Sequence, residues 1–251
     1  MHEPFTRAPS PRQSASTIPQ ILASYTSMGP FLARLVAQSY LASPMFTVTL
    51  QRDTIDIGGN VGMLAIGELP VGVQNTSLTW APVTGYSPSA GGLTAPANSP
   101  DEVYPVTWEI PLDDVYLDGQ KLPRSILSPA NISLTALIDT VSDPLKPLPV
   151  PRRACSPSIV QGNSLIRGPS DVIQSIINLL GGTRNLPCAS AHSLAFQIGG
   201  KMFPIDPRDF ITQAFEDSVD ECILNIAATD PPEVGGGYLY SWSLGDPFLK
   251  S

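Results

Sequence analysis

Residues 134–140 read LTALIDT and residues 162–170 read GNSLIRGPS, and these two segments decide which fold we expect. The first is apolar with little alternation, which is typical of a strand buried on both faces, and it ends in an Asp-Thr pair. The second leads through a Gly-Pro pair into Ser170, which can cap a following helix. An ionised side chain at the end of a buried strand is costly unless it is hydrogen-bonded or functional. Asp139 is therefore the first candidate site residue, and the alternative is an Asp that only caps a turn.

The two segments are separated by residues 141–161, VSDPLKPLPVPRRACSPSIVQ, which carry five prolines and two adjacent arginines. Without them the chain would read ALIDTGNSLIRGP. We expect residues 141–161 to be looped out, at a cost of roughly 3 kcal/mol for a loop of this length. Two origins remain open. A Val codon begins GT and a Gln codon can end AG, so a retained intron read through in frame would give this result; the alternative is a genuine loop insertion.

The composition favours many short strands joined by turns. The 251 residues include 27 Pro and 20 Gly, while only 14% are charged. The formal net charge of -8 argues against nucleic acid or an anionic membrane as a partner, since both select basic patches. No apolar run approaches the roughly 18 residues that a membrane span needs. The N-terminal residues have no apolar core typical of a signal peptide.

Residues 1–29 are rich in Pro, Ser and Thr and predict a poorly ordered lead, and regular apolar patterns begin at residue 30. Apolar periodicity predicts a helix over residues 30–41, a helix from Ser170 to Gly181, and a short helix from Asp206 to Ile211. The stripe of the second helix consists of Val172, Ile173, Ile176, Ile177 and Leu180. Strands are expected at 46–50, 63–66, 78–80, 106–110, 115–117, 134–138, 195–198, 201–203, 222–227 and 238–244. Hairpin turns are expected at 58–62, 118–119 and 199–200.

Other kinds of site find little support in the residues. His2 and His192, with three scattered cysteines, give no metal-ligand spacing, and no G-x-S-x-G elbow occurs. The odd number of cysteines leaves at least one unpaired within the chain. Asn75 and Asn131 begin N-glycosylation triplets, for which ordinary polar turns are the alternative explanation.

Several segments, taken together and in order, resemble the C-terminal lobe of a pepsin-like aspartic peptidase of the fungal type. They are WAPV (80–83), VTWEIPLDDVYLDGQKL (106–122), the Asp-Thr pair when joined to Gly162, the Gly-Pro pair before the helix, and LGD (244–246). The resemblance runs from about residue 30 to residue 251. It implies a lobe truncated at both ends and interrupted within the second active-site turn.

The resemblance also implies a fold and site residues. The fold would be all-β, with a few short helices. Asp139 would be catalytic, Thr140 and Gly162 would shape its turn, and Asn163 and Ser164 would support it. The family places one disulfide in this lobe, and the matching cysteines are Cys188 and Cys222, which leaves Cys155 inside the insertion.

The activity implied by the resemblance is endopeptidase activity at acid pH on a peptide or protein substrate, without a metal or organic cofactor. The protein would be secreted or vacuolar. The family uses two carboxylates that share a proton, one of which activates water. No second Asp-Thr-Gly or Asp-Ser-Gly occurs in the chain, so the other carboxylate would come from an N-terminal lobe or a second copy. We expect the chain alone to be inactive; the alternative is a non-catalytic fragment or peptide-binding remnant.

Overall fold

The computed structural model describes residues 35–36, 38–41, 45–50, 62–90, 94–95, 97, 100–101, 103, 105, 107–139, 165–214, 220–229 and 240–251. These residues are mainly β with a few short helices, which confirms the predicted fold class, and the arrangement is consistent with a single lobe of the pepsin-like fold. The expected lead (1–29) and the expected insertion (141–161) lie outside the described residues. Within the helix expected over 30–41, the described helical residues are Leu35 and Val36.

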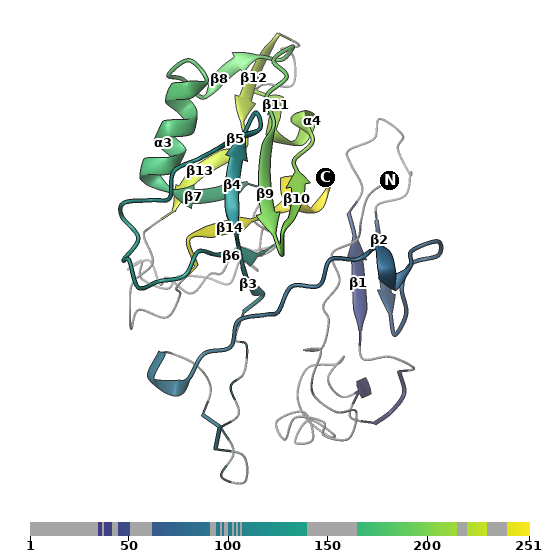
Figure 1. The fold of residues 1–251 in the computed structure, drawn as a ribbon. Helices are drawn as coiled ribbons and strands as arrows, with labels where there is room; N and C mark the ends of the chain where they lie inside the picture. The colour runs from purple at the N-terminus through teal and green to yellow at the C-terminus, as the bar shows by residue number, and fades with distance from the viewer. Residues whose placement is uncertain are drawn as a thin grey trace, which may run out of the picture.

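The largest sheet has the strand order β13-β7-β14-β6-β3 (Figure 1). Its members are β3 (Glu109–Pro111), β6 (Thr135–Ile138), β7 (Ile166–Pro169), β13 (Ile226–Thr229) and β14 (Trp242–Leu244). Although β14 is the last strand in the chain, it lies between β6 and β7, parallel to the first and antiparallel to the second. The strands on either side of the expected insertion are therefore joined through β14.

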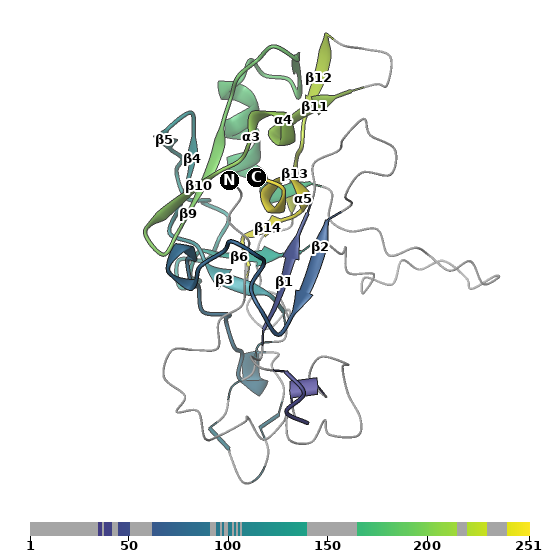
Figure 2. The ribbon, with the colours of Figure 1, turned by 90° about the vertical axis from the view of Figure 1, so that its right-hand side faces the viewer.

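Three smaller sheets complete the β-structure. One contains β4 (Asp114–Leu117), β5 (Gln120–Lys121), β9 (Leu194–Ile198) and β10 (Lys201–Pro204); another contains β8 (Asn185–Pro187), β11 (Ile211–Gln213) and β12 (Glu221–Leu224). The third is the antiparallel pair β1 (Phe46–Thr49) and β2 (Met63–Ile66), which lies to one side of the main sheet (Figure 2). Phe46 makes an edge-to-face contact with Trp108, at a centroid distance of 5.5 Å.

Short helices cover parts of these sheets. They are α3 (Ser170–Leu179), α4 (Pro207–Phe210) and α5 (Asp246–Leu249), with the 3-10 turns η2 (Asn75–Ser77) and η3 (Pro88–Ala90). Helix α3 packs on β7 and β13 (Figure 1). Its predicted apolar stripe is confirmed, because Val172, Ile173 and Ile176 are buried.

The apolar core meets the main sheet at Trp242 of β14. Its ring contacts that of Phe196 on β9 edge to face, at 5.3 Å between centroids. Gly168 of β7 lies beneath the same ring, so closely that a Cβ there would stand 2.5 Å from it. Only glycine fits this position without movement of the indole.

Local turn signals are confirmed in two places. Asp118 and Gly119, both with positive φ, connect β4 to β5, and Gly199 and Gly200 connect β9 to β10. Strands β1 and β2 pair as expected of a hairpin, although most of the predicted turn lies outside the described residues. The described part of the strand expected at 238–244 is β14.

Four local predictions are wrong. Ser170 is the first residue of α3 rather than its cap, and no side chain caps that helix. The strand expected over 222–227 is two strands in different sheets, separated at Asn225, whose side chain donates to the Asp209 carbonyl (2.9 Å). Helix α4 ends at Phe210, because Ile211 already belongs to β11. Residues 78–80 form no strand, because their backbone has no ladder partner among the described residues.

Candidate active site

Asp139 directly follows β6, an interior strand that lies between β14 and β3 in the main sheet. Thr135, Ala136 and Leu137 of that strand are buried, and Asp139 is partly buried. Its backbone N–H donates to the carbonyl of Leu244 in β14 (3.1 Å). The structure therefore confirms that this Asp ends a buried strand, and it adds β14 as the neighbour that fixes the backbone there.

The two sides of the expected turn are close together because β14 lies between them. Leu244 is in register with Ile138 on β6 and with Ile166 on β7. Two strand spacings separate β6 from β7, which is roughly 10 Å. Thr140, Gly162, Asn163 and Ser164 lie outside the described residues, so their roles in the turn stay predictions.

A row of four side chains, polar except for Leu137, crosses the face of the sheet that carries Asp139. Glu109, Leu137, Ser243 and Arg167 are in register across β3, β6, β14 and β7. Side chains two apart on a strand share a face, so Asp139 lies on the same face as Leu137. The opposite face carries Ala136, Trp242 and other core residues.

Glu109 is a fully buried carboxylate in this row. The hydroxyl of Tyr86 donates a hydrogen bond to its Oε2, whereas its Oε1 has no hydrogen-bond partner among the described residues. Burial raises the pKa of Tyr86 above its usual value, and the hydrogen bond to Glu109 and the negative charge of Glu109 raise it further. Sequence reasoning missed this pair. The only available signal was a polar residue within the alternating stretch 106–110, and nothing local marks it as buried.

Cys188 and Cys222 form a disulfide, with Cα atoms 4.9 Å apart. Cys188 follows β8 and Cys222 belongs to β12, so the bond links two adjacent strands of one sheet. Asn75 and Asn131, the candidate glycosylation sites, are exposed in a 3-10 turn and in a loop turn. Exposure is compatible with modification, and the glycosylation itself stays a prediction.

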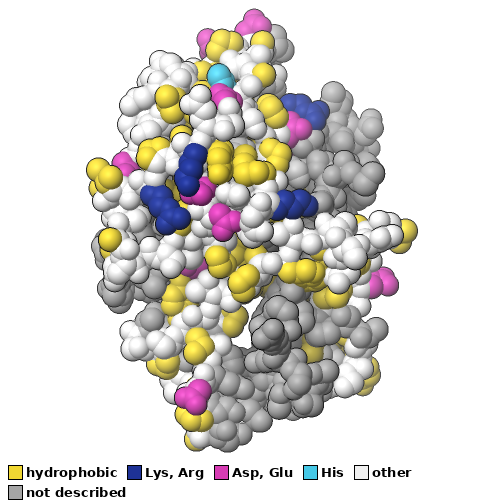
Figure 3. Space-filling model, in the orientation of Figure 1, with side chains coloured by type: hydrophobic (Ala, Val, Ile, Leu, Met, Phe, Trp, Pro, Cys, Tyr) yellow, Lys and Arg dark blue, Asp and Glu magenta, His cyan; other side chains and the backbone are white. Residues whose placement is uncertain are grey.

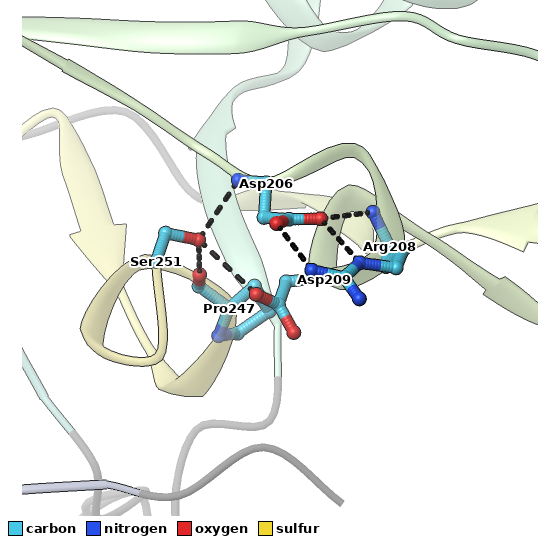
Figure 4. Close-up of polar contacts among 5 residues, drawn as sticks. All are labelled: Asp206, Arg208, Asp209, Pro247 and Ser251. Atoms are coloured by element: carbon cyan, nitrogen blue, oxygen red, sulfur yellow. Dashed lines mark hydrogen bonds and ion pairs between the residues drawn. The ribbon is translucent and has the colours of Figure 1, made fainter. Parts of the chain in front are cut away.

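Charged groups outside the main sheet form local structural contacts. His192 and Asp118 pair at 2.8 Å beside the β4–β5 turn, on the surface. Near Ser251, the Asp206 carboxylate accepts hydrogen bonds from the backbone and guanidinium of Arg208 (Figure 4). The Ser251 hydroxyl donates to the Pro247 carbonyl (2.7 Å) and accepts from the Asp206 backbone N–H (2.9 Å), and the Asp209 carboxylate lies 3.3 Å from the same hydroxyl. The contacts of Ser251 with Asp206 and Asp209 join the α4 segment to the residue that ends the α5 segment.

Acidic and basic side chains are interspersed on the described surface of the face in Figure 3. Lys121 and Asp114 form an ion pair at 2.7 Å. Within the described ranges, no group of three His, Cys, Asp or Glu side chains is placed to hold a metal ion. None of the helices described is long and apolar enough to cross a membrane.

Comparison with known proteins gives the site a context. Residues 148–251 match the family model "Eukaryotic aspartyl protease". Asp139 precedes this match. The chain is 25% identical to mouse Napsin-A over 229 residues, which cover 88% of this chain and 42% of that protein. It is 24% identical to dog Pepsin A over 243 residues (92% and 47%) and 25% identical to Xenopus laevis Cathepsin E-A over 230 residues (88% and 44%).

The chain thus spans less than half the length of the curated relatives it matches. The similarity to these relatives extends over most of the chain, and the mainly β structure is consistent with one lobe of their fold. Together, the family match and the relatives show that the chain is similar to pepsin-like aspartic peptidases.

Proposed function

We propose that the chain carries one catalytic carboxylate, Asp139, of an aspartic endopeptidase that hydrolyses peptide bonds at acid pH. The observation that carries the proposal is the position of Asp139. It ends a buried interior strand, and its backbone N–H is hydrogen-bonded to β14, which lies between the two flanks of the turn. A carboxylate at the end of a fixed strand, between the two flanks of a turn, can hold and activate a water molecule.

The proposed dyad needs a second carboxylate that restrains the ionisation of the first. An N-terminal lobe or a second copy of the chain would supply it, and the substrate would be a peptide or protein held between the two halves. Thr140 and Gly162 would shape the turn around Asp139, while Asn163 and Ser164 would support it. The chain alone would be inactive. As the resemblance to the pepsin-like family implies, the protein would be secreted or vacuolar.

A second candidate is a non-catalytic fragment or peptide-binding remnant, produced when an intron is retained. It is favoured by residues 141–161, which interrupt the proposed turn directly after Thr140. Sequencing the transcript across this junction decides between the origins of the segment. A second, shorter message that joins Thr140 to Gly162 would support the intron, and a message of the longer form only would exclude it.

The activity is tested with casein at about pH 3.5, in the range where one carboxylate of a dyad is ionised. The 251-residue chain and the product of the complete reading frame found by transcript sequencing are each compared with Asp139→Asn, and with Asp101→Asn as an exposed control. We expect no cleavage by the chain alone. The complete product should cleave casein, and Asp139→Asn should lower the rate at least about a hundredfold.

Asp101→Asn should leave that rate unchanged. Cleavage by the 251-residue chain that Asp139→Asn abolishes would show that the chain is active without another lobe. A complete product that cleaves no casein, or that cleaves it equally well as Asp139→Asn, would overturn the peptidase proposal in favour of the remnant.

A further inference from the structure

Two buried oxygen atoms on the polar face of the main sheet make no hydrogen bond to any residue that the structure describes. One is Oε1 of Glu109 on β3, and the other is Oγ1 of Thr135 on β6. Glu109 is fully buried and Thr135 is only 7% exposed, so bulk solvent does not reach either oxygen. Buried polar groups are nearly always hydrogen-bonded, to protein or to ordered water, and these two atoms therefore call for an explanation.

The register of β3 against β6 makes the two residues diagonal neighbours. Glu109 lies opposite Leu137 and Pro111 lies opposite Thr135, so the four side chains share one face of the sheet. The Cα atoms of diagonal neighbours are about 7 to 8 Å apart, which is within reach of a long side chain. Glu109 and Thr135 each face an apolar residue directly, and each has the other as its diagonal polar neighbour.

Glu109 is held on its other side by the chain that precedes β3. The Tyr86 hydroxyl donates a hydrogen bond to Oε2 of Glu109, and the backbone N–H of Thr84 donates to the Glu109 carbonyl (2.7 Å). Because Oε2 is already bound, the carboxylate cannot turn toward Thr135 without losing the hydrogen bond from Tyr86. A partner for Oε1 must therefore come to the carboxylate where it stands.

One water molecule can satisfy both atoms, because it can donate to the carboxylate oxygen and accept from the threonine hydroxyl. Two hydrogen bonds of about 2.8 Å span up to about 5.6 Å, which suits the separation of diagonal neighbours. Immobilising one water costs less free energy than leaving a buried carboxylate oxygen and a buried hydroxyl unpaired. A metal ion is less suitable, because no group of three His, Cys, Asp or Glu side chains gathers within the described ranges.

We propose that Glu109 and Thr135 bind one buried water molecule, which bridges Glu109 Oε1 and Thr135 Oγ1. The bridge joins β6, the strand that ends before Asp139, to the Tyr86–Glu109 pair at the edge of the sheet. It belongs to the folded chain and requires neither a second lobe nor a substrate. It can therefore be tested whether or not the chain is a peptidase.

The test combines oxygen-17 relaxation dispersion, which counts long-lived bound waters, with thermal unfolding of the full chain. Thr135→Val keeps the side-chain shape and removes the hydroxyl. It should lower the water count by one and the unfolding temperature by about 2 to 4 °C. Thr135→Ser keeps the hydroxyl and should retain the water. As a control, Thr212→Val removes a hydroxyl that donates directly to Asn225 (3.1 Å), so it should lower the unfolding temperature without changing the count.

A wild-type water count in Thr135→Val would overturn the proposal. So would a Thr135→Val chain that is as stable as the wild type or more stable, because that result is expected when an unpaired hydroxyl is removed. Should Thr135→Val fail to fold, a crystal structure of the wild-type chain decides. A water within hydrogen-bond distance of both oxygens would support the bridge, and either a metal ion or no density between them would contradict it. Casein cleavage plays no part in these outcomes, so failure of the peptidase proposal remains distinguishable.

Discussion

The two faces of the five-stranded sheet differ in how their groups are stabilised. One face carries Ile110, Ala136 and Trp242, all buried in one apolar core. The other carries Glu109 and Thr135, which are equally buried but polar, and each has a side-chain oxygen without a partner among the described residues. Asp139 belongs to the second face. Packing on the apolar face holds the strands in register, while the face with incomplete hydrogen bonding is the one that carries the proposed catalytic residue.

The largest effect is expected on the apolar face, at Trp242. Trp242→Ala should lower the free energy of unfolding by about 3 to 5 kcal/mol, since the buried ring contacts both Phe196 and Gly168. Urea unfolding followed by circular dichroism measures the loss. A loss below about 1 kcal/mol would show that β14 is not anchored by this side chain.

Gly168 tests the same packing contact from the neighbouring strand. Gly168→Ala should cost about 1 to 3 kcal/mol, because the new methyl group would overlap the indole ring. In the Trp242→Ala background the same substitution should cost much less, because the obstacle is gone. The double-mutant cycle checks this coupling, and additive effects would contradict the described contact.

On the polar face, the hydrogen bond from Tyr86 to Glu109 should contribute more to the free energy of unfolding than a partly buried tyrosine hydrogen bond does. Tyr86→Phe should lower the free energy of unfolding by about 1 to 3 kcal/mol, because it leaves the buried carboxylate without its donor. Tyr116→Phe, which removes a partly buried bond to Gln197, is the matched control and should cost less. Equal losses in the two variants would remove the distinction between the buried pair and an ordinary bond.

The raised pKa of Tyr86 adds a pH signature to this prediction. A tyrosine that holds its proton more tightly in the folded state contributes stability below its unfolded pKa of about 10, and this contribution falls as the pH rises above that value. The wild-type chain should therefore lose stability above about pH 10 more steeply than Tyr86→Phe. The same slope in both chains would contradict the assignment.

A smaller effect is expected at the helix that covers the apolar face. Partial burial acts to raise the pKa of Asp171, but hydrogen bonds from the Ser125 hydroxyl (2.7 Å) and the backbone of Ile126 (2.8 Å) lower it overall. A lowered pKa gives stability that is present above the unfolded value of about 4 and is lost as the pH falls through the folded value. Asp171→Asn should cost about 1 kcal/mol at pH 6 and progressively less below pH 4. Thermal unfolding of both chains at pH 6 and below pH 4 measures the cost of the substitution. A cost that is the same at both pH values would contradict the prediction.

Local signals in the sequence were enough to predict much of this fold. The two hairpin turns, the buried strand before Asp139 and the stripe of α3 follow from turn residues and periodicity. The break at Asn225 was missed because β12 and β13 are both apolar, and the separation is set by distant contacts of Asn225 with the α4 segment. The Tyr86–Glu109 pair was missed because its members come together only when the loop before β3 folds back.

In the candidate site, too, local features could be predicted from the sequence and long-range contacts could not. The position of Asp139 at a strand end could be predicted from the apolar run that precedes it. Its pairing with β14 could not, because Leu244 is far along the chain and enters the sheet only through tertiary packing.

The central claim is that pairing with β14 is sufficient to hold β6 and β7, the strands on either side of the Asp139 turn, in place. Residues 141–161 are then not needed for the fold. The most direct measurement is the urea unfolding free energy of a variant that lacks residues 141–161, compared with that of the full chain. We predict that the variant folds and that its free energy of unfolding equals that of the full chain or exceeds it by up to roughly 3 kcal/mol, because the entropic cost of closing the loop disappears. A variant that fails to fold, or is less stable than the full chain, would contradict the claim.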